Sequence, residues 1–247
     1  MSTAEVDERR VMLAASLEDV RQRIAAACVA AGRDPAAVRL LAVTKTFPAT
    51  DVALLTDLGL TAFAENRDQE AGPKAVELAG LRGDAPVHWH MVGRLQRNKA
   101  RSVVAWADTV QSVDSVRLAE ALAKASAAAR AEGLRTRPLD VLLQASIDGD
   151  PARGGCPLPD LPELADAVAG SGELVLRGVM AVAPLGSDPA KAFAALSDAA
   201  VRLREDHPGA VELSAGMSGD LEHAIAHGST CVRVGTALLG GRRLASP

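Results

Sequence analysis

The chain contains no tyrosine, and aromatic residues of all kinds make up only 2% of its 247 positions. A phenol is therefore excluded as a proton donor or acceptor anywhere in this sequence. Hydrophobic residues still make up 48%, so alanine, leucine and valine must pack the core. The three cysteines are too few and too widely spaced for a disulfide framework or a CxxC zinc site. Cys28 and Cys231 are expected in the core, and Cys156, in a glycine- and proline-rich stretch, is expected to be exposed.

Basic blocks, membrane-length apolar runs and linker-like stretches are also missing. The net charge is −4 and no cationic patch is interleaved with aromatics, which argues against a nucleic-acid partner. The acidic N-terminus and the short apolar runs predict neither a signal peptide nor a membrane anchor, and hence a cytoplasmic protein. A local run of cations at 94–101 is expected to be a solvated helix face. Without a linker, residues 1–247 are predicted to form a single domain.

What the sequence does contain is a regular alternation of apolar runs and helical stretches. Apolar residues recur every three to four positions over about 5–32, which predicts a leading helix that stops at Gly32. Eight near-continuous apolar runs then predict buried parallel strands, at 39–44, 61–65, 87–93, 109–113, 139–146, 176–183, 211–215 and 230–235. We therefore expect an α/β fold, a single (β/α)8 TIM barrel with an extra N-terminal helix. An open doubly wound sheet is the rival, but no GxGxxG follows the first strand.

The first predicted strand ends on Lys45, at the edge where barrel enzymes carry their chemistry. An ammonium that closes an apolar run either reaches out to water or is held for its reactivity. A desolvated amine forms Schiff bases with carbonyls, and pyridoxal phosphate is one such carbonyl. The alternative is a lysine that only caps a strand.

The loops after the seventh and eighth predicted strands have residues that are suited to binding an anion. In barrels of this kind these two loops commonly bind a phosphate. Ser218, Gly235 and Thr236 could supply hydroxyls and backbone amides there. The alternatives are that Ser218 is the N-cap of a helix at 221–226 and that Gly235 is a tight turn.

Arg233 lies between Val232 and Val234, so on a strand it points away from both and shares its face with Cys231 and Gly235. If that face lines the barrel, the guanidinium needs an acceptor. A pyridine ring nitrogen is one acceptor, and an acidic residue at the rim is the alternative.

No metal site is predicted. His88 and His90 fall on one strand face, and His223 and His227 are four apart on a helix, but neither pair has a third ligand or the glutamate of an HExxH motif. The helical pair is expected to face solvent, and His90 to lie behind the site.

Ordered blocks along nearly the whole chain resemble one known family. They are LLAVTK at 40–45, AEN and QE within 64–70, WHMVGRLQRNK at 89–99, QSVDS at 111–115, RGVMAVAP at 177–184, LSAGMSGD at 213–220 and STCVRVGTALLGGR at 229–242. This order is similar to the pyridoxal phosphate homeostasis proteins of the YggS/PROSC type. The resemblance implies a barrel like the N-terminal domain of alanine racemase.

Carried over to matching positions, the resemblance implies pyridoxal phosphate as the cofactor, held by Lys45 as an aldimine. Asn66 would lie beside the ring, Arg233 would face the ring nitrogen, and the phosphate would contact Ser218, Gly235 and Thr236. The implied function is vitamin B6 homeostasis without efficient catalysis and with no catalytic residue. The implied partners are pyridoxal phosphate and, by transient contact, apoenzymes that accept it, with no nucleic acid or membrane and a monomeric chain.

Two enzyme functions remain as alternatives. One is an amino-acid racemase of the alanine racemase type, which needs a second acid/base that Cys156 or His90 would have to supply. The sequence also ends soon after the eighth strand–helix unit, where a racemase is expected to continue into a second domain. The other is a Schiff-base aldolase, which needs no partner for a pyridine ring. Departures from the family pattern at Ala64, Arg67, Met91, Ser146 and Ala215 leave the outer wall of the pocket unpredicted.

Overall fold

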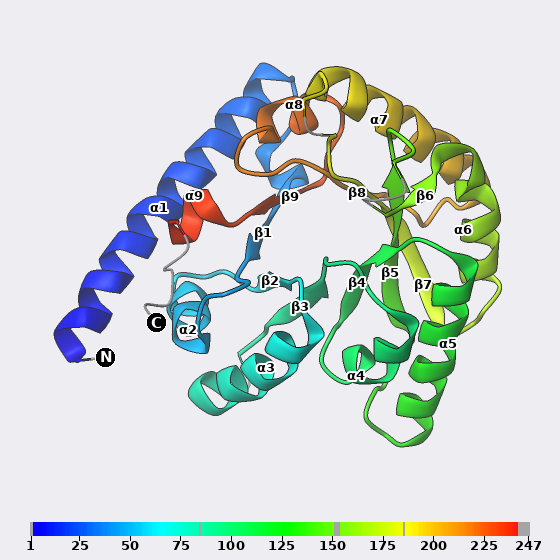
Figure 1. The fold of residues 1–247 in the computed structure, drawn as a ribbon. Coiled ribbons are helices and arrows are strands. Elements are labelled where there is room, and N and C mark those ends of the chain that lie inside the picture. Colours follow the sequence, from blue (N-terminus) through cyan, green and yellow to red (C-terminus); the bar gives the residue numbers. More distant parts are fainter. Residues whose placement is uncertain (1, 84, 151–153, 185, 242–247) are drawn as a thin grey trace.

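The computed structural model describes residues 2–83, 85–150, 154–184 and 186–241, in which eight parallel strands close into a barrel inside a layer of helices (Figure 1). The barrel strands are β1 (Arg39–Val43), β2 (Ala62–Glu65), β3 (His88–Met91), β4 (Thr109–Val113), β5 (Leu139–Ser146), β7 (Leu174–Met180), β8 (Glu212–Ser214) and β9 (Cys231–Val234). They pair in the order β4-β3-β2-β1-β9-β8-β7-β5, and the β4–β5 pairing closes the ring. The predicted TIM barrel is confirmed.

Helices alternate with these strands along the chain and cover their outer face. They are α1 (Thr3–Ala30), α2 (Ala49–Asp57), α3 (Asp68–Arg82), α4 (Ala100–Val104), α5 (Val116–Ala131), α6 (Leu161–Ala169), α7 (Pro189–Asp206), α8 (Leu221–Ala226) and α9 (Thr236–Leu239), with 3-10 turns η1 (Pro35–Ala37), η2 (Arg97–Lys99) and η3 (Leu158–Asp160). Across the described residues, none of the helices combines the length and apolarity needed to cross a bilayer.

The extra N-terminal helix α1 is longer than any other helix in the described part of the chain and lies along the outside of the barrel (blue in Figure 1). Its apolar stripe of Leu13, Leu17, Val20 and Ile24 is buried. It packs against α2, α8 and α9. The leading helix therefore supports the short helices that follow β8 and β9, where the anion-binding residues were predicted.

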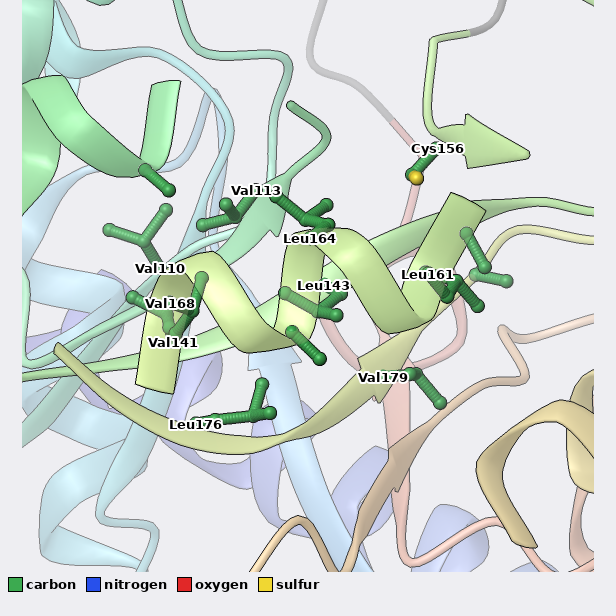
Figure 2. Close-up of a cluster of buried hydrophobic side chains, with 14 of the residues drawn as sticks. Val110, Val113, Val141, Leu143, Cys156, Leu161, Leu164, Val168, Leu176 and Val179 are labelled. Atoms are coloured by element: carbon green, nitrogen blue, oxygen red, sulfur yellow. The ribbon is translucent and has the colours of Figure 1, made fainter. Parts of the chain in front are cut away.

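The apolar core lies mainly between the strands and the helices. Figure 2 shows one part of it, where α6 packs on the outward side chains of β4, β5 and β7. Inside the barrel the apolar cluster is small and consists of Leu41, Ala62, Ala64 and Cys231. The rest of the interior is available to polar side chains, including those of Arg233 and His90.

The burial of Cys156 contradicts the prediction that this residue is exposed. It begins the two-residue strand β6 (Cys156–Pro157), pairs with Ala145 of β5 and is only 5% exposed. Figure 2 shows its side chain beside α6. Burial raises the pKa of this thiol to about 11. Cys28 and Cys231 are buried as predicted, and burial raises the pKa of both thiols. Reactive cysteines carry lowered pKa values, so these three are structural.

Candidate functional site

Lys45 lies in a tight turn directly after β1. The amide of Thr44 donates to the carbonyl of Ala64 on β2, and the carbonyl of Thr44 accepts from the amide of Phe47 at 3.1 Å. Thr46 has a φ of 69°. A β-branched residue in this left-handed region is strained, and such strain tends to occur at functional sites. The turn holds the half-buried Lys45 at the carboxyl end of the barrel.

A buried ion pair supports this turn from the helix side. Lys74 of α3 donates from Nζ to Glu65 Oε1 at 2.6 Å and to the carbonyl oxygen of Thr44 at 2.9 Å. Thr44 Oγ1 donates to the same Oε1 at 2.6 Å. Burial raises the pKa of the Glu65 carboxyl, against the opposing effect of Lys74. The sequence placed Glu65 at a strand end but offered no signal that Lys74 would be its partner.

The loops after β8 and β9 meet next to β1. Ser218 Oγ accepts from the amide of Ala237 at 3.4 Å, which ties one loop to the first turn of α9. The N-cap position of α8 belongs to Asp220, so the alternative of Ser218 as that cap is wrong. Gly235 is the N-cap of α9, and a Cβ there would lie 3.2 Å from the carbonyl oxygen of Val43. A glycine thus allows this loop to approach the strand that ends on Lys45.

Arg233 is 4% exposed and points into the barrel, as the strand alternation predicted. Its Nη1 donates to the carbonyl oxygen of Ser214 at 2.7 Å and to Ser214 Oγ at 2.9 Å, and Nη2 donates to the carbonyl oxygen of Ala181 at 2.8 Å. Burial lowers the pKa of the guanidinium, and neutral oxygens rather than a carboxylate hold it. The predicted alternative of a salt bridge at the rim is wrong.

A directed chain of hydrogen bonds continues from Arg233 across the barrel. Ser214 Oγ donates to Gln111 Oε1 at 2.7 Å, and Gln111 Nε2 lies 3.1 Å from His90 Nδ1. Because an amide nitrogen only donates, Nδ1 is the acceptor and the His90 proton is on Nε2. That Nε2 is buried and has no partner among the described residues. Burial holds the pKa of His90 well below its usual value. His90 lies behind the site, as predicted.

One cavity of about 270 Å³ brings most of the predicted site residues together. Five of the six predicted residues line it, namely Lys45, Ser218, Arg233, Gly235 and Thr236. The sequence did not indicate the remaining wall residues, which are Val43, Thr46, Phe47, Met217, Gly219 and Gly240. Asn66 instead lines an adjoining cavity of about 1140 Å³.

The described residues contain no cluster of histidine, cysteine and carboxylate side chains suited to a metal ion. His223 is exposed on α8 as predicted, whereas His227 is half-buried and places Nδ1 2.8 Å from the carbonyl oxygen of His223. The ring of His227 therefore contacts the backbone at the end of its own helix.

Comparisons with known proteins agree with this barrel. Residues 16–243 match the family model described as "Alanine racemase, N-terminal domain". The chain is 49% identical to a "Pyridoxal phosphate homeostasis protein" of Mycobacterium leprae, over 97% of this chain and 96% of that protein. The structure of PipY from Synechococcus elongatus with PLP bound has a TM-score of 0.78 at 34% identity, covering 92% of this chain and 100% of that one. An alanine racemase from Corynebacterium glutamicum, with a TM-score of 0.64 at 15% identity over 90% of this chain and 60% of its own, is alike in fold alone.

Proposed function

We propose a function for this chain, which belongs to the pyridoxal phosphate homeostasis protein family and has the alanine racemase N-terminal barrel. In this proposal the chain binds pyridoxal phosphate covalently through Lys45 and serves the homeostasis of that cofactor without efficient catalysis. Two findings on relatives support it: the name of the Mycobacterium leprae protein and the PLP bound to PipY.

The observation that carries the proposal is the cavity shared by Lys45, Arg233, Ser218 and Thr236. Bound pyridoxal phosphate supplies an aldehyde that reacts with amines and a pyridine ring that withdraws electrons. The cavity offers one amine for the aldehyde and one guanidinium for the ring nitrogen. Its hydroxyls and the amides at the start of α9 suit a phosphate. At about 270 Å³ it is slightly below the usual range for drug-sized ligands, which suits one small cofactor. The donor set therefore fits the group.

Arg233 has a defined role in this proposal. Ser214 and Ala181 hold its guanidinium in place through three hydrogen bonds. An arginine only donates hydrogen bonds, so a ring nitrogen facing it must stay an unprotonated acceptor. An unprotonated ring withdraws electrons weakly, which disfavours carbanion chemistry. Asn66 would complete the ring contacts by reaching over from the adjoining cavity.

Among the described residues that line the same cavity, Lys45 is the only candidate base for a racemase. Racemisation needs one base on each face of the substrate, and Lys45 can serve only one face. The chain has no tyrosine, and neither Cys156 nor His90 lines the cavity. The half-buried position of Lys45 suits a cofactor that is loaded from solution and handed by transient contact to apoenzymes. A monomeric, cytoplasmic protein is part of the same proposal.

The test is chemical reduction of the protein loaded with pyridoxal phosphate, followed by peptide mapping. Borohydride should fix the cofactor on Lys45. The matched variant Lys45→Arg keeps the positive charge but removes the reactive amine, and it should bind no cofactor covalently while its melting temperature stays near that of the parent. An adduct on Lys74, Lys99, Lys124 or Lys191 in place of Lys45 would show that the assignment is wrong.

A further inference from the structure

A second cavity at the mouth of the barrel shares no lining residue with the Lys45 cavity. Its volume is about 1140 Å³, and it opens at the carboxyl ends of β2, β3 and β4. Three segments form its walls, at 66–69, 94–99 and 114–118, together with Met91. Apart from Asn66, none of its lining residues has a role in the proposed cofactor site.

The walls of this cavity are strongly cationic. Five cationic and two acidic side chains line it: Arg67, Arg94, Arg97, Lys99 and Arg117 against Asp68 and Asp114. The chain as a whole has a net charge of −4, so the positive charge is concentrated here. The sequence predicted a solvated face for the run at 94–101, and Arg94 and Arg97 are exposed as predicted. Most cations of that run also line this cavity. Arg101 alone of its cations lies elsewhere, 3.3 Å from Glu132.

Four of these cations have no ionic partner among the described residues. Within the described part of the chain, no carboxylate lies within ion-pair distance of Arg94, Arg97, Lys99 or Arg117. The nearby Asp68 carboxylate is engaged by neutral donors, namely the Ser102 hydroxyl and the Trp106 indole. Only Arg67 is paired, with Glu70 at 3.0 Å. The four unpaired cations therefore create a positive electrostatic potential in the cavity, which favours the binding of an anion.

The 16-residue helix α5 begins in the same cavity. Its N-cap residue, Ser115, accepts no hydrogen bond from the helix amides, and its hydroxyl donates to Asp114 at 3.2 Å. The first turn of α5 contains no acidic residue. The amides of Val116 and Arg117 have no acceptor among the described residues. Free amides at a helix start add partial positive charge to the field of the four cations.

We propose that this cavity binds a small ligand carrying two or more phosphate groups. The four unpaired cations come from two separate segments, which suits phosphates spaced along one molecule better than a single phosphate. The volume exceeds the usual range for small-molecule pockets, so the ligand can be larger than pyridoxal phosphate. No aromatic side chain lines the described walls, so recognition depends on the phosphates and not on stacking with a base.

The experiment is calorimetric titration of the full chain with inorganic pyrophosphate, and separately with orthophosphate, in about 50 mM salt. Pyrophosphate should bind at least about 10-fold more tightly than orthophosphate, since each hydrogen bond to a charged group adds affinity. Arg94→Gln combined with Arg117→Gln should weaken pyrophosphate binding at least about 10-fold. The control Arg101→Gln removes a cation of the same run that does not line the cavity, and it should leave the affinity within about twofold.

Four results would overturn the proposal. The first is no measurable binding of pyrophosphate to the parent chain. The second is an equal loss of binding in Arg101→Gln, which would indicate a diffuse charge effect. The third is a loss in Ser218→Ala with Thr236→Ala but not in the arginine variant, which would put the anion in the Lys45 cavity. Preference for a single-stranded oligonucleotide over pyrophosphate would also contradict a small-molecule site. Unchanged melting temperatures would show that the variants fold.

Discussion

Lys74 donates from Nζ to the carbonyl oxygen of Thr44 at 2.9 Å, so a lysine outside the barrel holds the residue directly before Lys45. The same Nζ forms a buried ion pair with Glu65 at 2.6 Å. Thr44 and Glu65 lie at the ends of neighbouring strands. The position of the proposed cofactor lysine therefore depends on a second lysine that faces away from the cavity.

Removing Lys74 should destabilise the protein strongly. In Lys74→Met the Glu65 carboxylate would stay buried without its partner, and we expect a loss of about 3 to 5 kcal/mol in the free energy of unfolding. Urea denaturation measures this change. Lys74→Met combined with Glu65→Leu should recover most of the loss, because no charge is then left unpaired. The control Lys124→Met, at an exposed and unpaired position, should change stability by less than about 0.5 kcal/mol. If the double variant is as unstable as the single one, the ion pair is not the cause.

Removing two hydroxyls should weaken cofactor binding without unfolding the protein. Each hydrogen bond to a charged group is worth about 1.5 to 3 kcal/mol, so Ser218→Ala with Thr236→Ala should lower the affinity for pyridoxal phosphate roughly 100- to 10,000-fold. Backbone amides near Gly235 should keep some binding. Absorbance titration of the cofactor measures the affinity, and the apoprotein should melt near the parent temperature. Ser115→Ala, in the adjoining cavity, is the control. An unchanged affinity in the double variant would mean that the phosphate binds elsewhere.

Protein loaded with pyridoxal phosphate should not racemise amino acids at an enzymatic rate. Only one face of a substrate in the cavity would meet a base, Lys45, and Arg233 would weaken the ring as an electron acceptor. The measurement is α-proton exchange in deuterated water, with chiral analysis, over a panel of amino acids. Turnover of about 1 per second or more for any of them would be incompatible with a homeostasis role.

The stability of the protein should fall as the pH is lowered below neutrality, partly because of His90. Burial holds the pKa of His90 well below its usual value of 6.5 in the folded state, while the unfolded chain takes up a proton near 6.5. The unfolded state therefore binds more protons as the pH falls, and His90 contributes a loss of at most about 1.4 kcal/mol per pH unit. His90→Gln should lose stability less steeply between about pH 7 and pH 5.

The matched control for this pH dependence is His223→Gln, at an exposed position on α8, which should keep the parent slope. His88 is also half-buried with a pKa lowered by burial, so a smaller slope will persist in His90→Gln. Equal slopes in His90→Gln and the parent would show that folding does not lower the pKa of His90.

The sequence by itself determined the strands, the barrel and the direction of the Arg233 side chain. An apolar run reflects the burial of the segment that carries it, which is a local property. The strands predicted at 109–113 and 139–146 therefore match β4 and β5 at both ends. Strand alternation is equally local, and it correctly turned Arg233 away from Val232 and Val234. Strand ends and loop composition pointed to Lys45, Ser218, Gly235 and Thr236 of the cavity, whereas the role of Asn66 came from the family resemblance alone.

Only the tertiary structure decided which residues face one another. Arg233 meets Ser214 and Ala181 because barrel closure sets β7, β8 and β9 side by side. Cys156 was expected at the surface from its glycines and prolines, but pairing of β6 with β5 buries it. The cations at 94–99 were expected to face solvent, and Arg94 and Arg97 are exposed, but only the fold brings them to the wall of one cavity together with Arg117. Each of these outcomes depends on through-space pairing between segments far apart in the chain, and local periodicity contains no record of that pairing.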